Sequence, residues 1–284
     1  WRWKSPSLMM RNPHAAAPQW MGEPIEGKTI LLYSDQGMGD AIFFARYAPL
    51  VAARGARVIL QVEPLLVDLL KNVEGVAMCV EKGVTPPPFD LQCSLMSLPL
   101  AFGTAADSIP AKVPYLDPAI DRERWRERLA GLRAPRVGLV WSGNPNHIND
   151  HRRSVAFAQL APLLNLPMTF VSLQKDIRPA DRLAMQKYPQ VLDLGSEVEN
   201  FTDTAAVLSC LDVVVSVDTS VVHLAGALGR PVWVLLPYTP DWRWLLDRQD
   251  SPWYPTARLF RQDAARDWAA VIDEVRNALQ KLQR

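Results

Sequence analysis

The sequence predicts an α/β protein built on two doubly wound parallel sheets, and three observations support this. Short β-branched and aliphatic runs, such as Val213–Val217, alternate with helical patterns, as in successive βαβ units. Several runs end in a polar turn that opens a helix, as at Asp218–Ser220. The alternation weakens once, between residues 109 and 132. The 284 residues are therefore expected to form two Rossmann-like domains facing a cleft.

The first series is expected over residues 25–120, after a Pro-rich lead-in within residues 1–24. Its predicted strands are Lys28–Tyr33, Arg57–Val62, Val76–Val80 and Phe89–Cys93, and its predicted helices are Asp40–Arg54 and Pro64–Lys71. An irregular stretch, Ile109–Leu116, and a charged helix, Arg122–Leu132, follow it. They predict a linker that includes residues 121–135.

The second series is expected over residues 136–284, and its final helix could pack back on the rest of the chain. Its predicted strands are Arg136–Trp141, Met168–Leu173, Val191–Leu194, Val213–Val217 and Pro231–Leu236. Its predicted helices are Phe157–Leu164, Pro179–Lys187, Asp203–Cys210, one from Thr219 to about Leu228, and Asp267–Gln283.

Composition favours a globular protein with well-formed cores, because 49% of the residues are hydrophobic and 21% are charged. A net charge of +1 gives no general electrostatic footprint for nucleic acid. Three cysteines without a CxxC spacing indicate reduced thiols. No apolar run is long enough to span a membrane, and no signal peptide is recognisable. We therefore expect a cytoplasmic protein.

The loop after the first strand, Gln36–Asp40, has two glycines that allow a tight turn and close approach of the backbone to a ligand. As a dinucleotide fingerprint it is incomplete, because Ile42 occupies the third glycine position. Asp40 has two interpretations of similar weight. It is either the cap of the following helix or a carboxylate placed to act as a general base.

Two loops of the second series carry further polar side chains. Ser142 and Gly143 follow the strand at 136–141, and Arg153 ends the polar stretch His147–Arg153. The spacing of His147 and His151 would suit a metal on a helix, but the surrounding Pro, Asn and Asp indicate a loop, so no metal site is expected. Arg153 is either a partner for a diphosphate or a solvated surface residue.

The next loop places Gln174 and Lys175 directly after a strand, where they could contact a base edge and a phosphate. The most informative turn is Asp218–His223. Its helix N-terminus, the hydroxyls of Thr219 and Ser220, and an imidazole one turn later are suited to bind a phosphate or diphosphate. An ordinary capped strand–turn–helix unit with a core histidine explains the same residues equally well.

Five segments together resemble a known family. They are Gln36–Tyr47, Val137–Gly143, Ser172–Lys175, Asp218–Gly229, and Asp241–Trp244 with Ser251–Pro255. The set resembles the bacterial glycosyltransferase-like domain that follows tetratricopeptide repeats. That domain is similar to ADP-heptose:lipopolysaccharide heptosyltransferases and, more distantly, to the O-GlcNAc transferase catalytic domain. Trp1–Trp3 resembles the sequence between repeats and domain, which suggests an upstream repeat region.

This resemblance implies a GT-B fold with an N-terminal acceptor domain and a C-terminal nucleotide-sugar domain. The reaction implied is glycosyl transfer of the hexosyl or heptosyl class, from a UDP- or ADP-linked sugar to a glycan, lipid-linked or protein acceptor. Asp40 would be the catalytic base. The implied donor-binding residues are Gly39, Ser142, Gly143, Arg153, Asp218, Thr219, Ser220 and His223, joined by Gln174 and Lys175 from the loop above.

Neither a metal nor another cofactor is expected, since no Asp-x-Asp motif occurs. Two residues depart from the family pattern. Phe43 stands where relatives often carry Gln, and Ser220 stands where heptosyltransferases carry Gly. Two alternative functions stay open: a catalytically inactive binding or scaffold module of the same fold, and a nucleotide-sugar epimerase or hydrolase.

Overall fold

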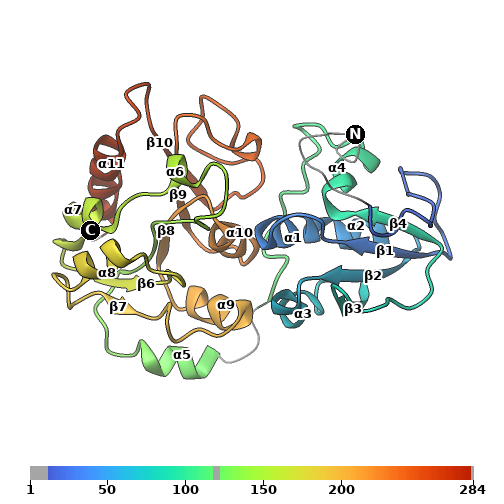
Figure 1. Ribbon diagram of the computed structural model, residues 1–284, viewed down its shortest axis with the longest axis horizontal. Helices are drawn as coiled ribbons and strands as arrows, with labels where there is room; N and C mark the ends of the chain where they lie inside the picture. The colour runs from blue at the N-terminus through green and yellow to red at the C-terminus, as the bar shows by residue number, and fades with distance from the viewer. Residues whose placement is uncertain (1–11, 118–121, 283–284) are drawn as a thin grey trace. The chain divides into compact units, whose positions relative to one another are not determined.

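The computed structural model describes residues 12–117 and 122–282 (Figure 1). The lead-in motif Trp1–Trp3 therefore lies outside the described residues. The chain divides into two compact units, Trp1–Ser108 and Ile109–Arg284. The irregular stretch after Ser108 belongs to the second unit because the backbone N–H groups of Tyr115 and Leu116 both bond to the carbonyl of Ala227, at 3.0 and 3.3 Å.

The first unit contains a four-stranded parallel sheet in the order β3-β2-β1-β4. Its strands are β1 Thr29–Tyr33, β2 Arg57–Val62, β3 Val76–Glu81 and β4 Leu91–Ser94. All four lie within two residues of their predicted bounds. The lead-in adds to the sheet, since Gln19 forms a parallel bridge with Gln92 beside β4.

The helices of the first unit are short. They are α1 Met38–Phe44, η2 Ala45–Tyr47, α2 Ala48–Ala52, α3 Pro64–Leu70, η3 Leu95–Ser97 and α4 Leu98–Ala101. The single helix predicted from Asp40 is thus three consecutive segments, α1, η2 and α2. Pro49 lies in the first turn of α2, where a proline is tolerated because its missing N–H would be unpaired anyway.

The second unit contains a six-stranded parallel sheet in the order β10-β9-β8-β5-β6-β7. Its strands are β5 Arg136–Val140, β6 Thr169–Ser172, β7 Leu192–Asp193, β8 Val213–Val217, β9 Val232–Leu236 and β10 Ala257–Arg261. The sequence missed β10. This strand lies at the edge of the sheet beside β9, and Arg258 on it is exposed, so it lacks the continuous apolar run of a buried strand.

The helices of the second unit are α5 Arg122–Arg128, α6 Asp150–Arg153, η4 Phe157–Leu160, α7 Ala161–Leu164, α8 Pro179–Met185, α9 Phe201–Ser209, α10 Ser220–Ala227, η5 Trp242–Trp244 and α11 Trp268–Lys281. One expectation needs correction. The segment around His151, predicted as a loop, is the helix α6, and Arg153 is the last residue of this helix. Asp150 begins α6 and is buried, which holds the segment in place despite its turn-forming residues.

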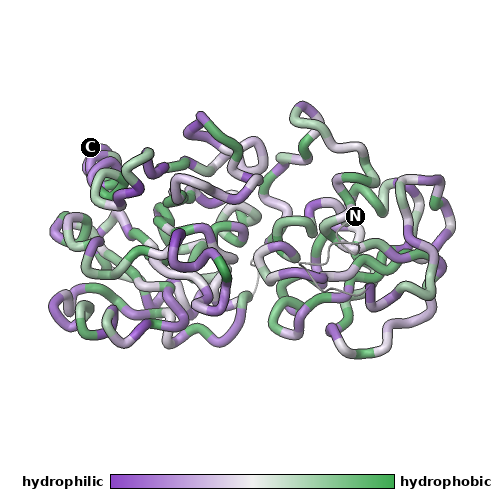
Figure 2. Tube along the Cα trace, turned by 45° about the horizontal axis from the view of Figure 1, so that its top comes forward, coloured by the Kyte–Doolittle hydropathy of each residue, from purple (hydrophilic) through white to green (hydrophobic). Residues whose placement is uncertain are grey.

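The core of the second unit is built on both faces of its sheet. Val213, Val215 and Val217 of β8 join a buried cluster with residues of η4, α7 and α11, and α7 and α11 lie side by side (Figure 1). The alternate residues of β8 face the other side, where α9 and α10 contact each other. Figure 2 shows hydrophobic and hydrophilic stretches alternating along both units.

Both units thus have the predicted α/β architecture of parallel sheets with intervening helices, and the fold prediction is confirmed in this respect. None of the helices in the described parts of the chain combines the length and the apolar character needed to cross a bilayer.

Candidate functional site

The site of the second unit forms where the direction of chain winding changes. β5 and β8 are neighbours, with Val140 opposite Ser216. The chain continues from β5 to β6 on one side, whereas β8 continues to β9 on the other. In open parallel sheets, ligands bind beyond the carboxyl ends of the strands at such a switch point. The residues directly after these two strands, Ser142–Gly143 and Asp218–Thr219, are therefore the candidate site.

Gln174 holds the loop that follows β5. Its Oε1 accepts hydrogen bonds from the backbone N–H groups of Trp141 and Ser142, at 3.1 and 3.0 Å. Its Nε2 donates to the carbonyls of Ser142 and Asp176, at 3.0 and 3.3 Å. The sequence suggested that Gln174 contacts a base edge. In the structure Gln174 is buried, and its hydrogen bonds hold the loop instead.

Gly143 rests on a polar network from α6. Its N–H donates to Ser154 Oγ at 3.0 Å, and that hydroxyl donates to Asp150 Oδ1 at 2.8 Å. Arg178 donates from Nη2 to Asp150 Oδ2 and to Ser154 Oγ. Asp150 is only 5% exposed, and a buried carboxylate is stable when it is paired and hydrogen-bonded in this way.

Arg153 links the loop after β5 to the turn after β8. Its Nη1 donates to the main-chain carbonyl of Asp218 at 2.8 Å, and its Nε lies 3.6 Å from Asp150 Oδ1. A Cβ on Gly143 would lie 2.6 Å from Arg153 Nη2. The absence of a side chain at Gly143 therefore lets the guanidinium approach the loop closely.

Helix α10 begins at the same place. Thr219 is its N-cap residue and makes no side-chain capping bond, while its Oγ1 lies 3.3 Å from Ser216 Oγ. Ser220 is the first helical residue. Ser142 is only 3% exposed, and its hydroxyl has no hydrogen-bond partner within the described residues. The backbone N–H groups of a helix start without a side-chain cap, an arginine and an unpaired hydroxyl together suit an anion.

Asp218 is the acidic member of the site. Its side chain is 16% exposed. Burial is the main cause that raises the pKa of this carboxyl to about 6; the neighbouring Asp241 acts in the same direction, while Arg243 and Arg153 oppose the rise. The Trp244 indole also lowers this pKa, although its N–H makes no hydrogen bond of normal geometry. The carboxyl therefore changes protonation state near neutral pH.

His223, one turn into α10, faces Asp218, with 3.9 Å between Nε2 and Oδ1. Its Nδ1 lies 3.3 Å from the hydroxyl of Tyr254. The indole of Trp244 stacks on the imidazole, with ring centroids 5.7 Å apart and planes 8° apart. The histidine is thus enclosed by the segment between β9 and β10.

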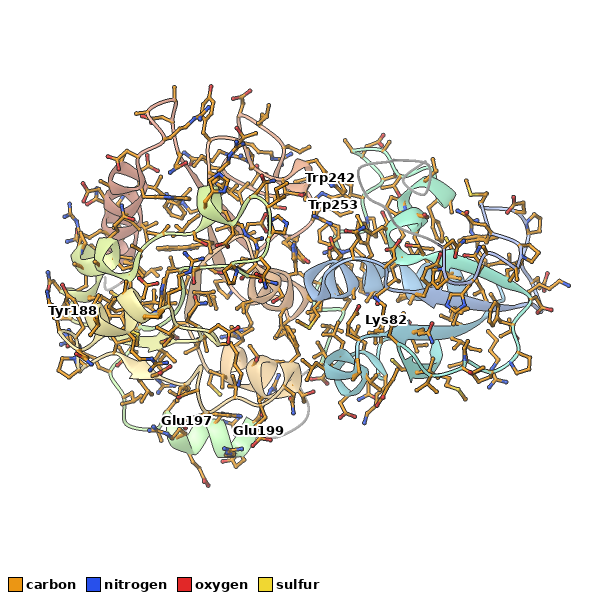
Figure 3. All side chains as sticks on the ribbon, in the orientation of Figure 1. Lys82, Tyr188, Glu197, Glu199, Trp242 and Trp253 are labelled. Atoms are coloured by element: carbon orange, nitrogen blue, oxygen red, sulfur yellow. The ribbon has the colours of Figure 1, made fainter. Side chains whose placement is uncertain are left out.

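Lys175, a predicted phosphate contact, makes its bond elsewhere, and two tryptophans near these loops pack in different ways. The Nζ of Lys175 donates to the carbonyl of Val198, in the segment that precedes α9. Trp141 is fully buried, and its indole N–H donates to Asp181 Oδ2 at 3.0 Å. Trp242 is half exposed and meets Trp253 edge to face, with centroids 6.0 Å apart (Figure 3).

Gly39 and Asp40 belong to the first unit, in the first turn of α1. Asp40 Oδ2 accepts a hydrogen bond from the N–H of Gly37 at 3.0 Å, so the carboxylate caps the start of this helix. The loop after β1 and the end of β4 lie at the switch point of this sheet. Within residues 12–117 and 122–282, no three His, Cys, Asp or Glu side chains are grouped as metal ligands.

Residues 196–266 match the family model of glycosyltransferase family 9 (heptosyltransferase). The matched segment contains the Asp218–His223 turn and the Trp244 and Tyr254 that enclose the histidine. Ser142, Gly143 and Arg153 lie outside it. The structure therefore brings residues from outside the matched segment to the Asp218–His223 turn within it.

Among known proteins, the chain is similar to Protein FlbA of Caulobacter vibrioides, with 26% identity over 289 residues. The match covers 92% of this chain and 48% of FlbA, so the chain spans about half the length of this relative. Two solved structures share the fold. The ADP-heptose LPS heptosyltransferase II of E. coli has a TM-score of 0.60 at 14% identity, covering 90% of this chain and 100% of the other.

The glycosyl transferase family 9 protein of Veillonella parvula has a TM-score of 0.64 at 11% identity, covering 92% of this chain and 98% of the other. At these identities the likeness establishes the fold, that of GT-B heptosyltransferases with two parallel sheets. Together with the family match, it supports the glycosyltransferase class predicted from sequence.

Sequence reasoning missed three residues that build the site: Asp150, Arg178 and Tyr254. Asp150 and Arg178 form the ion pair beneath Gly143, and Tyr254 contacts His223. The Asp-x-x-Arg spacing of Asp150 and Arg153 was a usable signal, because side chains three apart meet on a helix. Nothing local in the sequence signals Arg178. Tyr254 lies in Ser251–Pro255, one of the segments that carry the family resemblance, but its contact with His223 arises from tertiary packing.

Proposed function

We propose that this chain is a glycosyltransferase that moves a sugar from a nucleoside-diphosphate donor to a hydroxyl acceptor, without a metal ion. One observation carries the proposal. The family 9 match contains the Asp218–His223 turn, and Arg153 from outside the match is hydrogen-bonded to that turn. The groups suited to bind an anion therefore converge on a turn inside the segment that matches the family.

The chemistry of such a transfer requires stabilisation of a leaving diphosphate. The start of α10 offers backbone N–H groups and the positive end of the helix dipole. Arg153 offers a fixed cation, and the buried Ser142 hydroxyl offers a donor without a partner in the described chain. Preorganised donors of this kind stabilise charge that develops in the transition state. They take the place that a metal ion has in other transferases.

The acceptor hydroxyl must lose a proton during transfer, and we propose Asp40 as the base. A carboxylate can take the proton of a substrate hydroxyl, and the bond from the N–H of Gly37 holds Asp40 at the start of α1. We expect a UDP- or ADP-linked donor, and the name of the E. coli neighbour, an ADP-heptose transferase, favours ADP. Glycan, lipid-linked and protein acceptors all fit this chemistry. Upstream tetratricopeptide repeats and a cytoplasmic location stay predictions from sequence.

Calorimetric titration tests the donor site directly. The ligands are ADP-heptose, ADP, UDP-GlcNAc, UDP and GDP-mannose, each with wild type and with His223→Ala, and each with and without a chelator. We expect one nucleotide to bind, binding to fall sharply in His223→Ala, and the chelator to change nothing. Absence of binding by every nucleotide would overturn the donor proposal, and loss of binding with chelator would overturn metal independence.

A second candidate is a binding module of the same fold without turnover. The bond between Asp40 and Gly37 favours it, because a capping role alone explains the carboxylate. Donor hydrolysis and transfer to a panel of sugar acceptors, measured with wild type and Asp40→Asn, separate the two. Turnover that Asp40→Asn abolishes, with nucleotide affinity retained, supports the transferase. Tight nucleotide binding with no turnover in either protein supports the module.

A further inference from the structure

The residues around His223 determine the orientation of its ring and the partners of its two nitrogens. Tyr254 and Trp244 are fully buried, and His223 is 5% exposed. Trp244 covers one face of the imidazole in a parallel stack, and the Tyr254 hydroxyl meets Nδ1 at 3.3 Å. One ring nitrogen therefore faces a phenol, and the other faces the Asp218 carboxyl at 3.9 Å.

The place of Tyr254 is set by the helix that carries the histidine. A Cβ on Gly226 would lie 2.4 Å from Tyr254 Cδ1, and its three nearest atoms all belong to that ring. The absence of a side chain at Gly226 thus leaves the space on α10 against which the phenol ring packs. The hydroxyl of Tyr254 also lies 3.3 Å from the hydroxyl of Tyr115. The phenol is held both by its ring and by its oxygen.

We propose that Tyr254 is a positioning residue that holds neutral His223 in the tautomer with the proton on Nε2. In this arrangement Tyr115 O–H donates to Tyr254, Tyr254 O–H donates to Nδ1, and Nε2–H points toward Asp218. The geometry favours this order over its reverse. A bare Nε2 would set its lone pair against the Asp218 carboxylate, whereas Nε2–H is attracted to it.

This tautomer gives the site a neutral N–H donor beside the start of α10. That a phosphate of the donor accepts from Nε2–H rests on the proposed function. The opposite tautomer would present a lone pair to the phosphate and repel it. Trp244 contributes by holding the imidazole plane, so that the N–H keeps its direction.

The test is nitrogen-15 NMR of the imidazole, which separates protonated from bare ring nitrogens. Spectra of wild type, Tyr254→Phe and Tyr115→Phe are recorded at about pH 8.5, where an unperturbed imidazole is neutral. The His223 signals are assigned by their loss in His223→Gln. We expect protonated Nε2 and bare Nδ1 in wild type and in Tyr115→Phe, and a mixture of tautomers in Tyr254→Phe. Protonated Nδ1 in wild type, or no change in Tyr254→Phe, would overturn the proposal.

A second measurement separates this proposal from the proposed function. The nucleotide that binds wild type is titrated into Tyr254→Phe and Tyr115→Phe, and ADP and UDP are used if none is known. We expect an affinity loss of about tenfold in Tyr254→Phe and a smaller one in Tyr115→Phe. Failure of every nucleotide to bind wild type overturns the donor site, while the NMR result still decides the tautomer. Unchanged affinity in Tyr254→Phe, despite a changed tautomer, would show that no phosphate uses Nε2–H.

Discussion

The guanidinium of Arg153 donates to the main-chain carbonyl of Asp218 at 2.8 Å, which ties the segment after β5 to the turn after β8. The bond uses one nitrogen of the guanidinium and leaves the cation beside the start of α10. A positive charge held at this place strengthens the attraction that the helix dipole already exerts on an anion. The pairing of a main-chain oxygen with Arg153 therefore positions a charge instead of cancelling it.

Replacement of Arg153 tests this assignment against its neighbour. We expect Arg153→Ala to weaken nucleotide binding by about 10- to 100-fold, the value of a charge-assisted hydrogen bond. Arg152→Ala, which removes an exposed arginine of the same helix, should leave affinity within about twofold of wild type. Calorimetry of both variants is the measurement. Equal losses of nucleotide affinity in the two variants would mean that binding depends only on the overall positive charge of α6.

Asp218 makes the stability of the chain depend on pH. Burial raises the pKa of this carboxyl from 3.8 to about 6, so the folded chain holds the proton more tightly than the unfolded chain does. Asp218 therefore favours folding below about pH 4, and this contribution is lost as the pH rises through about 6. Asp218→Asn stays neutral throughout. As the pH rises from about 4 to above about 6, the free energy of unfolding of Asp218→Asn should increase relative to that of wild type by up to about 3 kcal/mol.

Chemical denaturation of wild type and Asp218→Asn at several pH values from about 4 to 7 measures this difference. The comparison cancels the titration of groups that lie far from Asp218. A difference that stays constant across the range would show that Asp218 titrates near its ordinary pKa.

The contact between Gly226 and Tyr254 predicts that Gly226→Ala has opposite effects on stability in wild type and in a Tyr254 variant. Gly226→Ala should destabilise the second unit by about 1–3 kcal/mol, because the new Cβ overlaps the tyrosine ring. In a Tyr254→Ala background the overlap is gone, and alanine is the better helix former by about 1 kcal/mol. There, the same substitution should stabilise. Additive effects in this double-mutant cycle, followed by thermal unfolding, would contradict the packing described.

We expect Asp181 to contribute to the stability of the second unit and not to the reaction. Its two oxygens accept from the Trp141 indole at 3.0 Å and from the backbone N–H of Phe157 at 2.8 Å. Asn at this position has a single acceptor oxygen, so one buried N–H loses its partner. We expect Asp181→Asn to lower the free energy of unfolding by about 1–3 kcal/mol, whereas Asp176→Asn, at an exposed position, should change it little. Equal stability of the two variants would contradict this role.

Much of the fold was predictable because buried parallel strands carry a strong local pattern. The bounds of β8 were predicted without error, since five consecutive buried residues of Val and Ser leave little ambiguity. β10 was missed because its two arginines break the apolar run. α6 was missed because Asn and Asp residues favour turns when tertiary contacts are left out of account. Both errors arise where packing outweighs local preference.

The candidate site was predictable only where it lies directly after a strand. The Ser142–Gly143 loop and the Asp218 turn were found because strand ends in parallel sheets converge. Lys175 also follows a strand, yet its loop takes a different path. A Cβ on Gly195 would lie 2.2 Å from the Gln174 carbonyl oxygen, so close packing between these two loops directs Lys175 toward Val198. Such a path depends on contacts distant in sequence.

Asp150 lies between Arg153 and Arg178, so the three side chains together carry one net positive charge instead of two. Under the proposed function, this limits how firmly the spent nucleotide is retained. A nucleoside diphosphate carries more negative charge after the sugar has left than before, because the terminal phosphate gains an ionisable oxygen. A site with two uncompensated arginines would hold this product longest and delay the next turnover. The buried carboxylate of Asp150 thus favours product release, at the expense of some donor affinity.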